Sequence, residues 1–168
     1  FDYVADIEET IKKLKQKPII IGHSMGGLIA LILCSRGYGK LGIFITPAAP
    51  KGINAITFSV LKIFFHNLFR WKFWSKPIPP NFPAAFYGVF HDFNRKRAFN
   101  IFNRSCSAES GRALCEIGFP YFFSPSPTDI NAEGIKCPTL IIGAGRDRIT
   151  PVQISKKLKK KLGERSEL

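Results

Sequence analysis

Acidic residues are scarce in this chain of 168 residues, which carries 12 aspartates and glutamates against 25 lysines and arginines and has a net charge of +13. A basic balance of this kind suits nucleic acid or an anionic membrane surface as a partner. The basic residues are scattered, however, apart from the run at 156–161, and no nucleic-acid-binding motif accompanies them. We therefore expect no nucleic-acid partner. We interpret residues 151–162 as a surface helix packed on a sheet, with Ile154, Leu158 and Leu162 on its buried face.

Cysteine is also sparse, and its spacing argues against two kinds of site. None of the four cysteines forms a Cys-x-x-Cys pair, so the sequence favours neither a zinc site nor a disulfide framework. Cys34 and Cys137 lie in apolar runs, and we expect both to be buried thiols in a reducing, cytoplasmic setting. A secretory signal is missing as well, because acidic residues occupy four of the first nine positions.

An uninterrupted apolar stretch long enough for a membrane span is missing too. Residues 53–74 have the length, but polar and charged side chains interrupt them. A transmembrane helix is therefore not expected, and an amphipathic segment on a membrane surface stays the weaker alternative. With 45% hydrophobic and 22% charged residues, the chain fits one soluble globular unit.

The hydrophobic pattern predicts alternating strands and helices. Apolar runs at 19–21, 41–46 and 139–143 favour strands, and because they show no alternation they are typical of a parallel sheet covered on both faces. Helices are expected at 6–14, 26–36 and 151–162; Val4, Ile7, Ile11 and Leu14 form the apolar face of the first. The fold class is therefore α/β, with a parallel sheet and flanking helices.

The most informative motif is Gly-His-Ser-Met-Gly-Gly at residues 22–27, which follows a predicted strand and opens a predicted helix. A serine at such a turn has a strained backbone, and its hydroxyl stands clear of the sheet. Gly22 and Gly26 are expected there because a side chain at either position would collide with the neighbouring strand or helix. The helix N-terminus aims N–H groups at an oxyanion formed beside Ser24. We expect His23 to point into neighbouring packing, away from the serine hydroxyl.

This motif resembles the nucleophile elbow of the α/β-hydrolase family, in the form found in esterases, lysophospholipases and haloperoxidases. Residues 137–151 look like the late strand and loop that carry the family's catalytic acid, at the position of Asp147. The resemblance implies that Ser24 is the nucleophile, Asp147 the acid of the catalytic triad, and the Met25 backbone N–H half of the oxyanion hole. It further implies hydrolysis of a carboxylic ester or thioester, a small ester-like substrate, and no cofactor or metal.

The chain departs from the family pattern at the third triad position. Its three histidines, His23, His66 and His91, all precede Asp147, and the family's first strands have no counterpart. We expect a partial α/β-hydrolase fold, cut at both ends, whose elbow strand has an open edge that favours self-association. A catalytically inactive fragment or split-gene remnant that keeps the pocket is the alternative function, and a basic, aromatic membrane-surface protein is a third hypothesis.

Residues 51–136 differ in composition from the rest and by position match the family's helical cap. We divide the chain into core segments at 1–50 and 137–168 and a cap at 51–136. Phenylalanine, tryptophan and proline concentrate in the cap. These aromatic side chains either line a pocket for an apolar acyl group or attach the cap to the core, and the sequence leaves both roles open.

Overall fold

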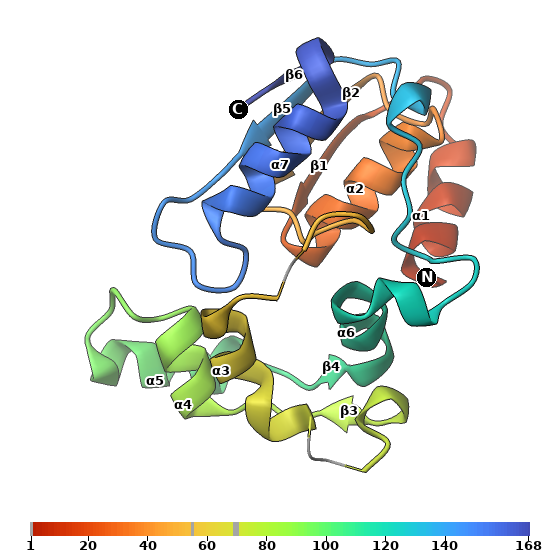
Figure 1. Ribbon diagram of the computed structural model, residues 1–168. Helices are drawn as coiled ribbons and strands as arrows, with labels where there is room; N and C mark the ends of the chain where they lie inside the picture. Colours follow the sequence, from red (N-terminus) through yellow and green to blue (C-terminus); the bar gives the residue numbers. More distant parts are fainter. Residues whose placement is uncertain (1, 55, 69–70) are drawn as a thin grey trace.

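The computed structural model of the chain describes residues 2–54, 56–68 and 71–168, and it has an α/β architecture with a parallel sheet at one end and a layer of helices at the other (Figure 1). The parallel sheet has the strand order β1-β2-β5-β6. Its strands are β1 (Ile19–His23), β2 (Leu41–Ile45), β5 (Thr139–Ile142) and β6 (Ser166–Glu167). The predicted strands and their parallel arrangement are therefore confirmed.

Three helices alternate with the strands of the parallel sheet along the chain. They are α1 (Asp2–Lys12), α2 (Met25–Ser35) and α7 (Val152–Leu162). Ile154 and Leu158 of α7 are buried and join the side chains of α2 in one hydrophobic cluster, as the spacing of the lysine-rich helix predicts. The apolar face expected for α1 is only half confirmed: Val4 is buried, whereas Ile7 is exposed.

Burial alternates along each of the longer strands. Ile20, Phe44 and Ile141 are buried in the cluster that α2 and α7 form above the sheet. The residues between them point to the opposite face, where Ile19, Ile21 and Ile142 stay exposed. The expectation of a sheet covered on both faces is therefore wrong for the described residues, although the apolar composition that prompted it is present on both faces.

Two buried thiols lie close together within this cluster. Cys34 of α2 and Cys137, just before β5, are both buried and both free, as the sequence predicts. The Sγ atom of each lies near Gly39, so the two thiols are neighbours. Burial and the adjacent thiol of Cys137 raise the pKa of the Cys34 thiol above its ordinary value.

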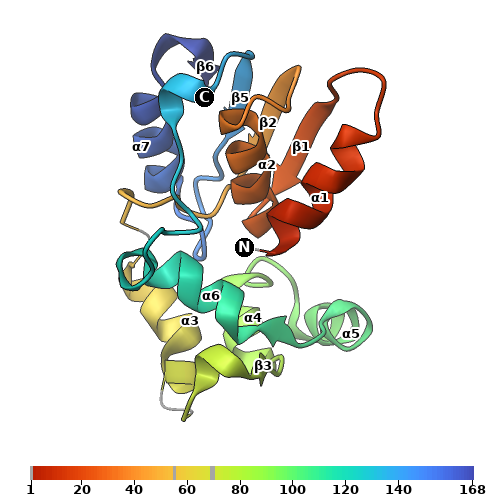
Figure 2. The ribbon, with the colours of Figure 1, turned by 90° about the vertical axis from the view of Figure 1, so that its right-hand side faces the viewer.

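The second layer is made by the middle of the chain, at the end of the molecule away from the sheet (Figures 1 and 2). Its helices are α3 (Phe58–Leu68), α4 (Phe82–Gly88), α5 (Arg95–Ser105) and α6 (Gly111–Gly118), and its strands β3 (Pro77–Ile78) and β4 (Glu109–Ser110) pair antiparallel. Short 3-10 helices occur along both parts of the chain, namely η1 (Phe73–Ser75), η2 (Pro120–Phe122), η3 (Ala132–Gly134) and η4 (Gly163–Arg165).

Aromatic packing holds the helices of this layer together. The ring of Phe82 in α4 meets Phe99 and Phe102 of α5 edge to face, with centroids 5.1 Å and 5.3 Å apart. The guanidinium of Arg95 lies 5.6 Å from the centroid of the same ring. Phe82 therefore joins α4 to α5, with ring contacts that stabilise the pair beyond simple burial.

Candidate active site

Ser24 occupies a strained turn between β1 and α2. Its φ angle is 54° and its ψ angle is −119°, a backbone conformation that residues with a side chain rarely adopt. Hydrogen bonds hold the turn in place: the Ser24 N–H donates to the Ile45 carbonyl at 3.0 Å, and the Ser24 carbonyl accepts from the Ala48 N–H at 2.9 Å. The next strand and the loop after it thus fix the serine backbone, as a nucleophile elbow requires.

The glycines around the turn are needed for close packing, but not at both predicted positions. A Cβ atom on Gly22 would stand 2.0 Å from the Gly26 carbonyl oxygen, an impossible approach. A Cβ atom on Gly26 would meet nothing within 4 Å, so the expectation of a clash there is wrong. Gly27 is the second crowded position, with its Cβ direction 3.0 Å from the Cα atom of Pro47.

Asp147 lies in the loop that follows β5, and its carboxylate is well supplied with donors. One oxygen accepts the backbone N–H groups of Ile149 and Thr150, each at 2.8 Å, and the other accepts the Thr150 hydroxyl at 2.9 Å. These bonds fix the orientation of the carboxylate. They also fit a purely structural role, in which Asp147 only stabilises its own turn.

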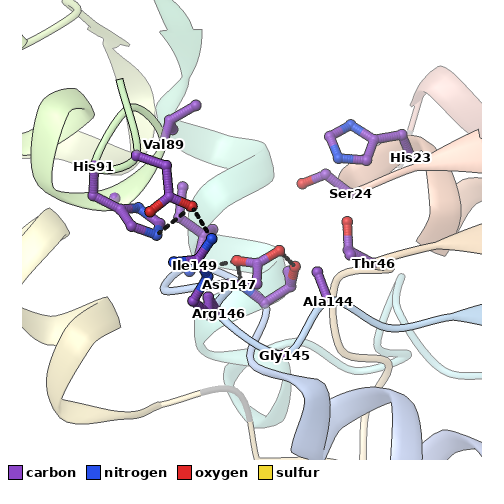
Figure 3. A pocket seen from close by; sticks show the side chains of 13 residues that line it. His23, Ser24, Thr46, Val89, His91, Ala144, Gly145, Arg146, Asp147 and Ile149 are labelled. Carbon is purple, nitrogen blue, oxygen red and sulfur yellow. Dashed lines mark hydrogen bonds and ion pairs between the residues drawn. The ribbon is translucent and has the colours of Figure 1, made fainter. Parts of the chain in front are cut away.

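Ser24 and Asp147 line the same cavity, which has a volume of about 470 Å³ (Figure 3). They reach it from neighbouring positions, because β1 and β5 run parallel on either side of β2 and both side chains follow the carboxyl ends of their strands. The expected geometry, with both residues at one edge of the sheet, is therefore confirmed. Their catalytic roles stay a prediction, as does that of the Met25 N–H at the start of α2.

Thr46 is a candidate residue that the sequence does not single out. It directly follows β2, the strand between β1 and β5, and lines the cavity with Ser24 and Asp147 (Figure 3). Its φ angle is 37°, and its buried hydroxyl has no hydrogen-bond partner in the part of the chain that the structure describes. Strained backbone and an unsatisfied buried hydroxyl are features of functional sites. No motif marks Thr46, because both features depend on tertiary contacts.

His91 is a second residue that sequence reasoning does not place in the site. It enters the cavity from the helical layer, just after α4, and its Nδ1 atom is buried without a partner among the described residues. Its Nε2 atom lies 3.9 Å from a carboxylate oxygen of Asp92. Figure 3 shows His91 on the far side of Asp147 from Ser24.

His23 does not lie where the sequence analysis expects it. Its side chain is exposed and lines the cavity next to Ser24, instead of packing against neighbouring residues (Figure 3). The elbow projects from the end of the sheet, so the residue before the serine also faces the open cavity. Neither His23 nor His91 donates a hydrogen bond to Ser24 or Asp147 in the described residues. His66 is a position whose side chain lies outside the described ones.

The loop that carries Asp147 is attached to the helical layer on both sides of the aspartate. Arg146 forms an ion pair with Asp92 at 3.0 Å. Arg148 donates to the Tyr87 carbonyl at 3.0 Å, and its guanidinium lies 4.6 Å from the centroid of the Tyr87 ring. Asp147 therefore faces the cavity, whereas the arginines on either side of it contact the helical layer. These contacts couple the position of the helical layer to that of the Asp147 carboxylate.

The cavity lining is small and mixed in polarity. Val89, Ile149 and Ala144 supply apolar walls, and among the described residues no phenylalanine, tyrosine or tryptophan lines the cavity. The aromatic side chains that the structure describes in the middle segment therefore lie elsewhere. Within the described residues no group of three or more histidine, cysteine or acidic side chains is placed to hold a metal ion.

Comparison with known proteins places these observations in a family. The model of the "Alpha/beta hydrolase family" matches residues 1–166, nearly the whole chain. A search of the curated proteins gives no match.

Several solved structures share the fold. A lipase-esterase related protein from Clostridium acetobutylicum has a TM-score of 0.68 at 18% identity, over 99% of this chain and 64% of its own. An α/β fold family hydrolase from Bacillus anthracis has a TM-score of 0.62 at 14% identity, again over 99% of this chain and 64% of its own. A monoacylglycerol lipase from Paleococcus ferrophilus has a TM-score of 0.56 at 17% identity, over 99% of this chain and 62% of its own. The chain thus spans less than two thirds of the length of each.

Proposed function

The chain belongs to the alpha/beta hydrolase family, and from this premise we propose that the whole protein is a serine hydrolase of carboxylic esters or thioesters with an apolar acyl group. The observation that carries the proposal is the shared cavity. A serine on a strained elbow and a carboxylate held by three hydrogen bonds face the same space from the ends of parallel strands.

In the proposed reaction the Ser24 hydroxyl oxygen attacks the carbonyl carbon of the substrate. A histidine oriented by Asp147 takes the serine proton and passes it to the leaving alcohol or thiol. The Met25 N–H, at the first turn of α2, stabilises the negative charge that develops on the carbonyl oxygen. Water then cleaves the acyl-enzyme and regenerates Ser24. No step requires a metal or cofactor.

The walls of the cavity support an acyl group of modest size. Val89 comes from the helical layer and Ile149 from the loop of Asp147, so the apolar contacts lie opposite the elbow. We propose that residues 51–136 act as a cap over a core made by 1–50 and 137–168. The bonds of Arg146 to Asp92, just after α4, and of Arg148 to Tyr87, within α4, support this role for the middle of the chain.

One observation favours a second candidate, a domain that binds ester-like molecules without hydrolysing them. Both carboxylate oxygens of Asp147 already accept hydrogen bonds from its own turn, and neither described histidine of the cavity contacts it through a hydrogen bond. In this alternative Ser24 has no general base to activate it, and the cavity binds a substrate that it leaves intact.

The test compares two proteins: the 168-residue chain and the full product of its reading frame, with any flanking coding sequence. Turnover of p-nitrophenyl esters with acetyl, butyryl and octanoyl groups is measured for both. We expect the full product to hydrolyse them and the 168-residue chain to stay at background, because no histidine follows Asp147. Loss of one triad member lowers turnover by roughly a thousandfold or more.

Matched variants decide which residues act. Ser24→Ala and Asp147→Asn should abolish turnover in the full product, whereas Ser105→Ala, an exposed serine on α5, should leave it unchanged. Full activity of Ser24→Ala would overturn the proposed nucleophile. If no ester is hydrolysed but one binds with an affinity that His91→Phe reduces, the non-catalytic alternative holds.

Two further expectations belong to this proposal. We propose that the protein works in the cytoplasm, where free thiols such as Cys34 and Cys137 stay reduced. We also propose that the chain self-associates through the exposed side of β1, which lies at the end of the strand order and carries Ile19 and Ile21.

A further inference from the structure

Residues 71–76, just before β3, lie at the end of the molecule far from the parallel sheet (Figures 1 and 2). The chain contains two tryptophans, Trp71 and Trp74, and both lie in this segment. Their side chains are exposed, with 78% of the surface of Trp71 and 44% of that of Trp74 accessible to solvent. We refer to residues 71–76 as the tryptophan tip. Two exposed indoles at one protruding end are unusual for a surface in contact with water alone.

The tip is held firmly by its neighbours. A Cβ atom on Gly111 would stand 2.0 Å from the Phe73 carbonyl oxygen, so the start of α6 packs directly against the backbone of the tip. Ile78, in the strand that follows, is buried, and β3 pairs with β4 beside it. Phe73 meets Trp74 edge to face with centroids 5.6 Å apart. The backbone that carries the two indoles is therefore held in place by α6 and by the pairing of β3 with β4.

Helix α3, which leads into the tip, carries an exposed apolar stripe. Phe58, Leu61 and Phe65 recur at the spacing of one helical face, and all three are exposed. Phe58 has 81% of its surface accessible. The stripe on α3 and the tryptophan tip thus both turn large apolar side chains to solvent.

Positive charge accompanies these apolar side chains. Residues 54–108 contain eight lysines and arginines and one acidic residue, Asp92. Asp92 pairs with Arg146 at the candidate active site, so its charge is neutralised there. Lys72 and Lys76 of the tip are exposed, and their ammonium groups make no ion pair among the described residues. The local charge is therefore positive and complements an anionic surface.

We propose that the tryptophan tip docks this protein on an anionic lipid membrane, with the two indoles in the headgroup layer and Lys72 and Lys76 beside lipid phosphates. Tryptophan favours the membrane interface because its ring is apolar and its N–H is polar. Basic residues add attraction to anionic lipid. Among the described helices none is long and apolar enough to cross a bilayer. The proposed contact is interfacial, made by the side chains of the tip.

A single-stranded nucleic acid is the competing partner, because it also binds basic and aromatic side chains. Such proteins use a groove that follows the strand. The tip is instead a protruding end (Figure 1), and the cavity described above is lined by residues that follow the strands and by residues of the helical layer (Figure 3). A protruding apolar tip with flanking lysines fits insertion into lipid better. The proposal does not depend on any chemistry at Ser24.

Tryptophan fluorescence reads out the contact directly, because both tryptophans lie in the tip. The wild-type chain is titrated with vesicles of phosphatidylcholine alone and of phosphatidylcholine with 30% phosphatidylglycerol. We expect a blue shift of the emission and quenching by brominated acyl chains with the anionic vesicles only. Salt at about 1 M should reverse the binding, since it screens charges beyond a few ångströms.

Variants test which charges matter. Lys72→Glu with Lys76→Glu should weaken binding to anionic vesicles at least about tenfold, since each basic residue near the membrane contributes about fivefold. The matched control, Lys156→Glu with Lys157→Glu on α7, changes the net charge equally at the other end of the molecule and should bind like the wild type. Circular dichroism spectra and thermal melts check that each variant is folded.

Three outcomes would overturn the proposal. Binding without any change of emission would place the contact elsewhere, and an equal loss in the α7 control would reduce it to the general attraction of a basic chain. A shift of emission with oligothymidine but not with anionic vesicles would assign the tip to nucleic acid. Because the wild-type titration needs no substitution, a variant that fails to fold leaves the test intact.

Discussion

The two faces of the parallel sheet carry similar side chains but meet different surroundings. In β1, Ile20 is 9% exposed beneath α2, whereas its neighbour Ile21 is 61% exposed on the opposite face. The same contrast recurs in β5, where Ile141 is buried and Ile142 is exposed. The three successive isoleucines of β1, Ile19 to Ile21, therefore face two environments, one packed and one open to solvent.

The contrast teaches that strand composition reports what a sheet is suited to contact, not what covers it. Isoleucine on both sides of a strand is typical of parallel sheets with helices on both faces. On the packed face each buried isoleucine contributes about 2 kcal/mol or more to folding. On the open face the same side chain contributes little to folding. Together with the edge of β1 it forms an apolar surface to which another chain can bind.

The largest expected effect comes from a matched pair of substitutions in β1. Ile20→Ala should lower the free energy of unfolding by about 2–4 kcal/mol, because it leaves a cavity beneath α2. Ile21→Ala removes the same atoms from the open face and should cost less than about 1 kcal/mol. Urea denaturation of both variants measures the difference. Equal losses would mean that the second face is packed in solution, for instance by a second copy of the chain.

A smaller change in stability, but a clear change in mass, is expected from charging the open face. Ile19→Lys with Ile21→Lys places two positive charges on the exposed side of the edge strand, and this should suppress self-association. Light scattering after size-exclusion chromatography measures the mass. The matched control is Phe122→Lys, an exposed aromatic residue outside the sheet, which should leave the oligomers unchanged. A wild-type chain that is already a monodisperse monomer would contradict the proposed self-association.

The smallest effect tests a position that belongs to neither face. Ser24 lies at the end of the sheet with a φ angle of 54°, which glycine adopts without strain. Ser24→Gly should therefore raise the free energy of unfolding by about 1 kcal/mol, the usual cost of such strain, while it removes the proposed nucleophile. Ser24→Ala keeps the strain and serves as the comparison. A stability gain in both variants would point to the hydroxyl group, not the backbone, as the source of strain.

Much of the core could be predicted from the sequence because its signals are local. The strand before Ser24, the helix after it and the lysine-rich helix near the end follow from apolar runs, glycines and helical spacing. Ser24 and Asp147 were predicted to share one edge of the sheet, because parallel strands bring their carboxyl ends together. The clash expected at Gly26 and the packing expected for His23 were wrong, since both depend on how tightly the elbow fits its surroundings.

The middle of the chain was harder to interpret, because its aromatic residues suit several roles at once. The structure uses Phe82 to join α4 to α5 and leaves both tryptophans exposed at the far end. Sequence spacing does not distinguish a phenylalanine packed between two helices from an exposed tryptophan in a segment with little periodicity. The role of His91 is likewise hidden, because only the folded chain brings it to the cavity of Ser24.

The sequence by itself determined the strand-elbow-helix unit, the parallel sheet, and the places of Ser24 and Asp147 after their strands. These features follow from backbone strain and hydrophobic periodicity, which act over a few neighbouring positions. Only the tertiary structure decided which face of the sheet is covered, that Thr46 with its buried hydroxyl lines the cavity of Ser24 and Asp147, and that Arg146 and Arg148 attach the acid loop to the helical layer. These features depend on contacts between segments far apart in the chain, which no local pattern encodes.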